Sequence, residues 1–304
     1  MSRIFGFGSA AVDFRIVTAD FGESYREKLL ARETMLCDGG SVANALVQAA
    51  ALGGECVFLG KLGDDPVGRR ILAALKAERV DTGAAIVVPG AQSPFNLAVY
   101  AGERRRRVGG FLLPNVAATV SAEELEVWAE LLRPEDWCLV ELGEIPLDTV
   151  NAFCQLARRR GVKLAVDVDL DPLRQCGADR ETVEAIFSAC HLLVPNRNAI
   201  FELYRTERPD ELAGQLRERF GVPAVITAGA DGVYWSGEPG EPARHLAAPP
   251  VEVVDTVGAG DAFHGGLLYG LSQGLALEGA IALGSRCGAD ACRFFGARPR
   301  RDTK

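Results

Sequence analysis

The chain has 304 residues, of which 48% are hydrophobic and 24% charged, as in a soluble globular enzyme of one large or two small domains. A net charge of -8 argues against a general nucleic-acid binder, and no apolar run is long enough to span a membrane. The first residues enter a strand pattern directly, so we expect no signal peptide and a cytoplasmic location. The eight cysteines include no C-x-x-C pair, which favours buried free thiols over a metal site or disulfides.

Strand-like and helix-like runs alternate along most of the chain, which is typical of a parallel sheet covered by helices on both faces. The predicted core strands are residues 4–8, 56–59, 138–142, 163–168, 192–194 and 224–227, with a further short strand at 251–254. The predicted helices are residues 41–52, 66–78, 122–132, 147–160, 180–189, 210–220, 262–273 and 277–294. The expected fold is therefore a three-layer, Rossmann-like α/β arrangement in a single domain, residues 1–304.

Two segments interrupt this alternation, because neither leaves room for a crossover helix. We expect approximately residues 12–17 and 94–113 to leave the main sheet and pair with one another as a small β-flap, or lid. Phe95, Leu97 and Val99 alternate onto one side of their strand, and Val108 is expected to join them from the next strand. A small flap cannot bury such a face alone, which predicts a homodimer formed through the lid.

Residues 254–263 read Val-Asp-Thr-Val-Gly-Ala-Gly-Asp-Ala-Phe and place a glycine-rich turn before an apolar helix. Such a turn directs the N–H groups of Gly258, Ala259 and Gly260 outward at the positive end of the helix, which suits a phosphate or an oxyanion. Asp261 lies among these donors, where a carboxylate can accept a proton from a bound hydroxyl. The stretch therefore predicts phosphoryl transfer to an alcohol.

This ten-residue string resembles the C-terminal signature of the ribokinase-like (PfkB) carbohydrate kinases. Residues 39–45, Gly-Gly-Ser-Val-Ala-Asn-Ala, together with residues 60–68, resemble the N-terminal signature of the same family at the expected separation. The resemblance covers nearly the whole chain. It implies an ATP-dependent kinase that uses Mg²⁺ and phosphorylates a primary hydroxyl of a small sugar. It also implies that the flap is a substrate lid and often a dimer interface.

Five residues are candidates for holding the sugar. Gly39 and Gly40 precede a helix, where paired glycines let the backbone approach a small polar molecule, and Asn44 can both donate to and accept from a hydroxyl. Asp13 follows the first strand, at the sheet edge where open α/β folds bind ligands, and matches the family aspartate that holds sugar hydroxyls. Glu144 also follows a core strand and approximately matches a family sugar contact, but its local spacing is imperfect and its role stays open.

The resemblance places the nucleotide at a second set of residues. The loop that contains Thr227, Gly229, Asp231 and Gly232 resembles the family loop around the ribose and phosphates of ATP. Pro195 and Asn196 open a predicted helix, and Asn196 matches the family asparagine near the triphosphate. No P-loop lysine motif is present, so the phosphates are expected to be held by backbone donors and Mg²⁺.

The chain departs from the family pattern at two places that bear on metal binding. The family glutamate that helps to position Mg²⁺ is replaced by Ala199, and whether Glu202 substitutes for it stays open. Residues 167–171 carry three alternating aspartates in place of Asp-x-Asn-x-Arg, and these either gather a cation or are solvated. By resemblance, Asp255 and the carbonyl of Val257 are expected to hold a monovalent cation, usually potassium, that shapes the anion hole.

Alternative functions remain open at this stage. The acceptor could instead be a nucleoside or a phosphorylated or acidic sugar, and residues 104–107, four arginines, fit an acidic substrate as well as a charged edge strand. A non-catalytic sugar-binding regulator is consistent with the missing glutamate but not with an intact Asp261. His264 is expected to serve packing or solvation rather than catalysis.

Overall fold

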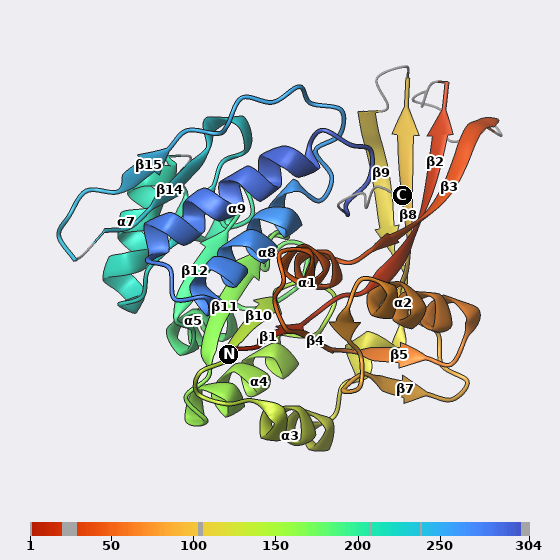
Figure 1. The fold of residues 1–304 in the computed structure, drawn as a ribbon, viewed down its shortest axis with the longest axis horizontal. Helices are drawn as coiled ribbons and strands as arrows, with labels where there is room; N and C mark the ends of the chain where they lie inside the picture. The colour runs from red at the N-terminus through yellow and green to blue at the C-terminus, as the bar shows by residue number, and fades with distance from the viewer. Residues whose placement is uncertain (1, 20–28, 103–105, 207, 238, 299–304) are drawn as a thin grey trace.

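The computed structural model describes residues 2–19, 29–102, 106–206, 208–237 and 239–298. Its centre is a six-stranded sheet in the order β12-β11-β10-β1-β4-β6, in which every pairing is parallel (Figure 1). The strands are β1 (Ile4–Phe7), β4 (Cys56–Leu59), β6 (Val80–Asp81), β10 (Trp137–Glu141), β11 (Lys163–Val168) and β12 (Leu192–Pro195). This confirms the predicted mostly parallel sheet.

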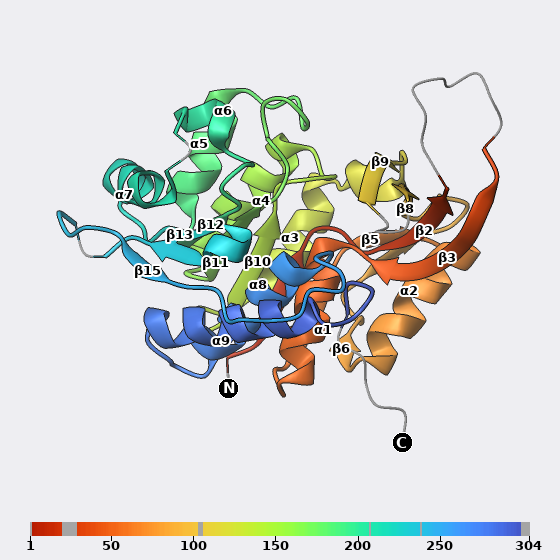
Figure 2. The same ribbon diagram turned by 90° about the horizontal axis from the view of Figure 1, so that it is seen from above.

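Helices cover both faces of this sheet and form two separate hydrophobic cores (Figure 2). One face carries α1 (Ser41–Ala51), α2 (Pro66–Ala77), α8 (Ala259–Ser272) and α9 (Leu277–Ala291). The other carries α3 (Ala122–Leu131), α4 (Leu147–Arg159) and α5 (Arg180–Ala189). In α4 the buried residues Val150, Phe153, Cys154 and Ala157 recur three or four positions apart, so one apolar stripe faces the sheet. No described helix is long and apolar enough to cross a bilayer.

A second, three-stranded sheet continues the core sheet beyond β12. It consists of β13 (Val225–Thr227), β14 (Val233–Trp235) and β15 (Arg244–Leu246), which pair antiparallel. Isolated parallel bridges from Leu193 to Ala224 and from Asn196 to Thr227 join it to β12. The helices α6 (Phe201–Tyr204) and α7 (Pro209–Phe220) precede β13 in the chain. The strand predicted at residues 224–227 therefore exists, but it adjoins the core sheet instead of pairing with it along its length.

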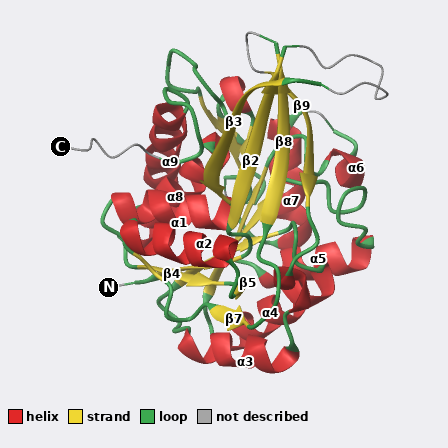
Figure 3. Ribbon diagram, turned by 90° about the vertical axis from the view of Figure 1, so that its right-hand side faces the viewer, coloured by secondary structure: helices red, strands yellow, loops and turns green. Residues whose placement is uncertain are grey.

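The flap is a four-stranded sheet that stands apart from the core sheet (Figure 3). Its order is β3-β2-β8-β9, with β2 (Ala11–Thr18), β3 (Ala31–Gly39), β8 (Phe95–Ala101) and β9 (Arg106–Leu112). The predicted segments do pair with one another, and β3 is an additional strand that lacks an apolar run by which to recognise it. A short parallel pair, β5 (Lys61–Gly63) and β7 (Ile86–Val88), completes the strands.

The two faces of the flap differ in character because side chains alternate along each strand. On β2, Arg15 and Val17 are buried, whereas Phe14 and Ile16 on the opposite face are half-buried. The strand register places Leu36, Phe14, Leu97 and Phe111 in one row across all four strands. Leu36 is 51% exposed and Phe111 is 61% exposed, so this row is an open apolar face.

One predicted strand is absent, and the ends of two predicted helices differ from the structure by three residues. Residues 251–254 form no strand, because the N–H groups of Val254 and Asp255 donate to the carbonyl of Cys292 at the end of α9 and not to a sheet. Helix α8 starts at Ala259, three residues before the predicted position, and α9 ends at Ala291 instead of residue 294. The earlier start of α8 places Gly260 and Asp261 inside its first turn.

Candidate active site

The N-terminus of α8 carries a row of unpaired N–H groups. Gly258 caps the helix with φ of 84°, and a Cβ atom there would lie 2.5 Å from the Cα of Ala297, so only glycine fits. The N–H groups of Gly258, Gly260 and Asp261 have no acceptor among the described residues. The N–H of Ala259 donates to the carbonyl of Thr256 at 3.2 Å, so this predicted donor is engaged within the turn. The open donors therefore include Asp261 itself.

The carboxylate of Asp261 lies beside these donors and is half-buried. The side-chain amide of Asn44, on α1, donates to its Oδ2 at 2.7 Å. Burial raises the pKa of Asp261 to about 7, against the lowering effect of the Asn44 hydrogen bond, and the nearby Asp167 raises the pKa further. A carboxyl with a pKa near neutrality is suited to accept and release a proton at physiological pH.

His264 lies one turn further along α8 and is buried beneath the site. Its Nε2 is 3.3 Å from the carbonyl of Val194 and 3.5 Å from Oδ1 of Asp167. Burial lowers the pKa of His264 and raises the pKa of Asp167 well above its ordinary value, so it disfavours the charged form of both. Of Asp167, Asp261 and His264, only Asp261 is partly exposed, and His264 packs beneath it.

Two predicted sugar residues meet at the inner face of the flap. Asn96, on β8, donates to Oδ1 of Asp13 at 3.2 Å, and its hydrogen bond also lowers the pKa of Glu144. Burial nevertheless raises the pKa of Glu144 to about 7, with further raising by Glu141 and Asp13. The structure thus places Glu144 next to Asp13, which the sequence alone left open. Its other partner is the side-chain amide of Asn115, which donates to its Oε2 at 3.1 Å.

Of the two paired glycines, Gly39 lies beside the carboxylate of Asp13 and also contacts Arg298, which the sequence did not predict. A Cβ at Gly39 would lie 2.6 Å from Oδ2 of Asp13, and Gly40 has φ of 90°, so the backbone lies against the sugar-binding candidates. Arg298 donates through Nε to Oδ1 of Asn44 at 2.9 Å and through Nη2 to the carbonyl of Gly39 at 3.2 Å. Burial lowers the pKa of Arg298, against the raising effects of nearby carboxylates that include Asp13 and Asp261.

The predicted nucleotide residues also lie together. The N–H of Arg197 donates to the carbonyl of Thr227 at 3.0 Å, which fixes the segment after Asn196 against β13. Asp231 accepts from Nη1 of Arg197 at 2.7 Å. The loop turns at Gly229 and Gly232, with φ of 58° and 91°. At Gly232 a Cβ would clash with the backbone of residues 246–248, whereas at Gly229 it would meet nothing within 4 Å.

The three aspartates at and after the end of β11 do not gather around one point. Asp167 is buried beside His264, and Asp171 is turned into the chain, where it accepts from the N–H groups of Leu173 and Arg174 at 2.9 Å. Asp169 alone is exposed, and its charge acts on both Asp167 and Asp261. Across the described ranges, no group of three or more His, Cys, Asp or Glu side chains is arranged to hold a metal ion.

A model of the pfkB family of carbohydrate kinases matches residues 1–304. This chain belongs to that family. A ribokinase from Bacillus subtilis is 27% identical over 98% of this chain and 95% of that protein. A fructokinase from Klebsiella pneumoniae is 31% identical over 86% of this chain and 87% of that protein. The crystal structure of phosphofructokinase-2 from Escherichia coli in complex with potassium has a TM-score of 0.78 at 21% identity, covering 98% of this chain and 95% of that one.

The family and the named relatives indicate that this protein is an ATP-dependent sugar kinase. Kinases of this family typically use Mg²⁺ together with ATP. Family membership confirms the enzyme class against the alternative of a non-catalytic regulator. Sequence reasoning missed three side chains of the site: Arg15, Asn96 and Arg298. Arg15 was detectable in principle, since it lies two positions after Asp13 on one strand and therefore on the same face. Nothing in the sequence around Arg298 marks it.

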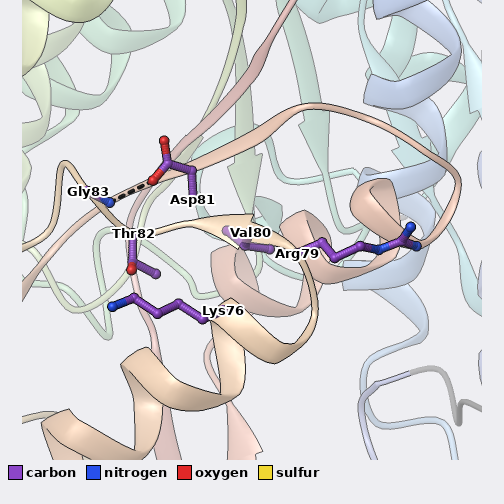
Figure 4. A pocket seen from close by; sticks show the side chains of 6 residues that line it. All are labelled: Lys76, Arg79, Val80, Asp81, Thr82 and Gly83. Atoms are coloured by element: carbon purple, nitrogen blue, oxygen red, sulfur yellow. Dashed lines mark hydrogen bonds between the residues drawn. The ribbon is translucent and has the colours of Figure 1, made fainter.

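A hollow on the far edge of the kinase is separate from this site. Figure 4 shows it at the end of α2, where Oδ1 of Asp81 accepts from the N–H of Gly83 at 2.8 Å. Its lining residues are Lys76, Arg79, Val80, Asp81, Thr82 and Gly83. None of these is a predicted site residue, so the chemistry is assigned to the end of α8. The side chain of Glu202 and the four arginine side chains of residues 104–107 lie outside the part of the chain that the structure describes.

Two glycine substitutions separate folding from anion binding at this turn. We expect Gly258→Ala to lower the melting temperature, because its positive φ and the contact with Ala297 both oppose a side chain. Gly260→Ala should leave the melting temperature unchanged, since a Cβ there meets nothing within 4 Å, yet it should reduce turnover by narrowing the space for a phosphoryl group. Thermal melting and steady-state kinetics on both variants check this. Equal losses of stability would contradict it.

Proposed function

We propose that this kinase transfers the terminal phosphoryl group of ATP to a primary hydroxyl of a small sugar, with Asp261 as the general base. The observation that carries the proposal is the coincidence of a carboxyl with a pKa of about 7 and open N–H donors on one helix turn. The carboxylate accepts the hydroxyl proton as the oxygen attacks. The N–H groups of Gly258, Gly260 and Asp261 stabilise the charge that develops on the transferred group.

The acceptor residues orient the sugar hydroxyl toward Asp261. Asp13 and Glu144 offer carboxyl oxygens to sugar hydroxyls, and Asn96 holds both of them. Gly39 and Gly40 bring the backbone close to the sugar. Asn44 combines a sugar contact with the hydrogen bond that keeps the pKa of Asp261 from rising further.

The nucleotide residues are assigned to ATP. Gly229 leaves open space at a turn of the loop, and Thr227, Asp231, Gly232 and Asn196 border it, which fits a ribose and phosphate chain. Mg²⁺ bound with ATP would neutralise phosphate charge. We assign its protein contact to Asp169, because this exposed carboxylate acts electrostatically on Asp261 and carboxylate oxygen is the ligand that Mg²⁺ prefers.

An acidic sugar is a second candidate acceptor, and Arg298 favours it. A guanidinium that already binds Gly39 and Asn44 is placed to pair with a carboxylate or phosphate on the acceptor. The test of the proposed function is release of ADP from ATP in the presence of a panel. The panel holds ribose, fructose, 2-keto-3-deoxygluconate, sugar phosphates and adenosine. Absence of ADP release with every acceptor would overturn the proposal.

The acid limb of the pH–rate profile tests Asp261. Because its pKa is raised to about 7, the carboxyl is protonated and inactive at lower pH, so kcat/KM should fall about tenfold per pH unit below pH 7. Asp261→Asn should lower turnover by about a hundredfold or more and remove this limb, with little change in folding or sugar binding. If the limb is unchanged in Asp261→Asn, Asp261 is not the general base.

Asn44→Ala should move the acid limb of the pH–rate profile to higher pH, since a hydrogen bond that lowers the pKa of Asp261 is lost.

The Arg298→Met variant tests whether the acceptor is acidic or neutral. If the guanidinium pairs with an anionic acceptor, KM for that acceptor should rise about tenfold or more, while KM for a neutral sugar changes little. Arg70→Met is the matched control, because Arg70 is an exposed arginine that pairs with Asp38 outside the site. A wild-type enzyme that accepts only neutral sugars would exclude the acidic class.

The assembly and location of the kinase also stay proposals. We propose a homodimer through the open apolar face of the flap, and a cytoplasmic location, which agrees with eight free thiols. Phe111→Glu should convert a dimer to a monomer in light scattering at micromolar concentration. Val127→Glu, an equally exposed position on α3, should not. A monomeric wild-type protein would contradict the proposal.

A further inference from the structure

Arg15 is a wholly buried arginine between the flap and the C-terminal segment. It lies on β2, and its side chain is 1% exposed. Its Nη2 is 3.8 Å from Oδ2 of Asp13, and its Nη1 is 3.7 Å from Oδ2 of Asp255. The guanidinium also lies over the rings of Tyr100 and Phe295, with its carbon 6.0 and 5.5 Å from the ring centroids. Arg15 therefore connects the sugar-binding face of the flap to the loop before α8.

The side chain is held by charge and shape, without hydrogen bonds. None of its three nitrogens has a hydrogen-bond partner among the described residues. A buried cation is retained only where counter-charges lie close, and an arginine cannot shed its proton to escape the cost. The carboxylates of Asp13 and Asp255 supply that counter-charge. The positive charge at this point is consequently permanent.

Asp255 is the residue that ties together the loop of the anion hole. Its Oδ1 accepts from the N–H of Val257 at 3.1 Å, and its Oδ2 accepts from the N–H of Gly296 at 3.2 Å. The same loop is bonded to the end of α9 through the carbonyl of Cys292. Gly258 directly follows Val257 in this loop, so the position of Asp255 determines the direction of the open N–H groups at the start of α8.

These contacts do not fit the monovalent cation that the sequence predicts at Asp255 and Val257. Both carboxylate oxygens are already engaged by N–H donors, and a fixed guanidinium faces one of them. A second cation at that carboxylate would be repelled by Arg15 at short range and in a buried setting. We propose that Arg15 itself supplies the positive charge of the site, and that this kinase works without potassium.

Arg15 is then a positioning residue, which acts on the transferred phosphoryl group through Asp255 and the loop 255–260. This rests on the proposed function of that loop as the anion hole. A loop moved by a fraction of an ångström loses transition-state stabilisation more than substrate binding, so the loss appears in kcat. An arginine that bound the acceptor instead would show its loss in the KM of the acceptor.

The experiment compares wild type, Arg15→Met and Arg15→Lys in tetramethylammonium, sodium and potassium chloride at constant ionic strength. Wild-type kcat should be equal in the three salts. Arg15→Met should lose about a hundredfold in kcat without potassium and regain most of it with potassium, because the vacated charge site can then bind the ion. Arg15→Lys should keep an intermediate kcat that is insensitive to salt. Arg293→Met, an exposed arginine on the same segment, should behave as wild type.

Thermal melting in the same salts gives a readout that needs no acceptor. Potassium should raise the melting temperature of Arg15→Met but not that of wild type. Three results would overturn the inference. They are a wild-type enzyme that potassium activates, an Arg15→Met variant with normal kcat in the absence of potassium, and a folded Arg15→Met variant whose only change is in the KM of the acceptor. Failure of the proposed function looks different, since no acceptor would then support ADP release while the melting comparison still decides the role of Arg15.

Discussion

The carboxylate of Asp261 and a set of open N–H donors share the first turn of α8, so each affects the electrostatics of the other. Donors that attract a phosphoryl group also favour the ionised form of Asp261, whereas burial and Asp167 oppose it. The balance leaves the carboxyl with a pKa near neutrality, where it can exchange a proton with a hydroxyl. A fully solvated aspartate would be a weaker base, and a fully buried one would stay protonated.

Burial acts in the same direction on several acids around this turn. It raises the pKa of Glu141, Glu144 and Asp167 and so disfavours their charged forms. Arg15 contributes positive charge beside Asp13 and Asp255, and Arg298 contributes it beside Asn44 and Gly39. The raised carboxyl pKa values and the two arginines both limit the net negative charge at the proposed acceptor site.

The site also depends on the junction between two separate sheets. The core sheet brings α8 and the nucleotide loop to its edge, and the flap brings Asp13, Arg15 and Asn96. Alternation along β2 places Asp13, Arg15 and Val17 on the inner face of the flap and Phe14 and Ile16 on its more open outer face. One strand, β2, thus presents Asp13 and Arg15 on one side and Phe14 of the open apolar row on the other.

The sequence by itself determined the alternation of core strands and helices, the parallel core sheet and the glycine-rich turn with Asp261, because these follow from periodicity, chain spacing and local backbone freedom. It also marked Asp13 and Asn44 as candidates, since strand and helix ends are readable locally. Only the tertiary structure decided that α8 begins at Ala259, that Asn96 links Asp13 to Glu144, and that Arg15 and Arg298 enter the site. These partners are separated by up to 259 residues along the chain, and the pKa of a carboxyl depends on which distant groups bury it and bond to it.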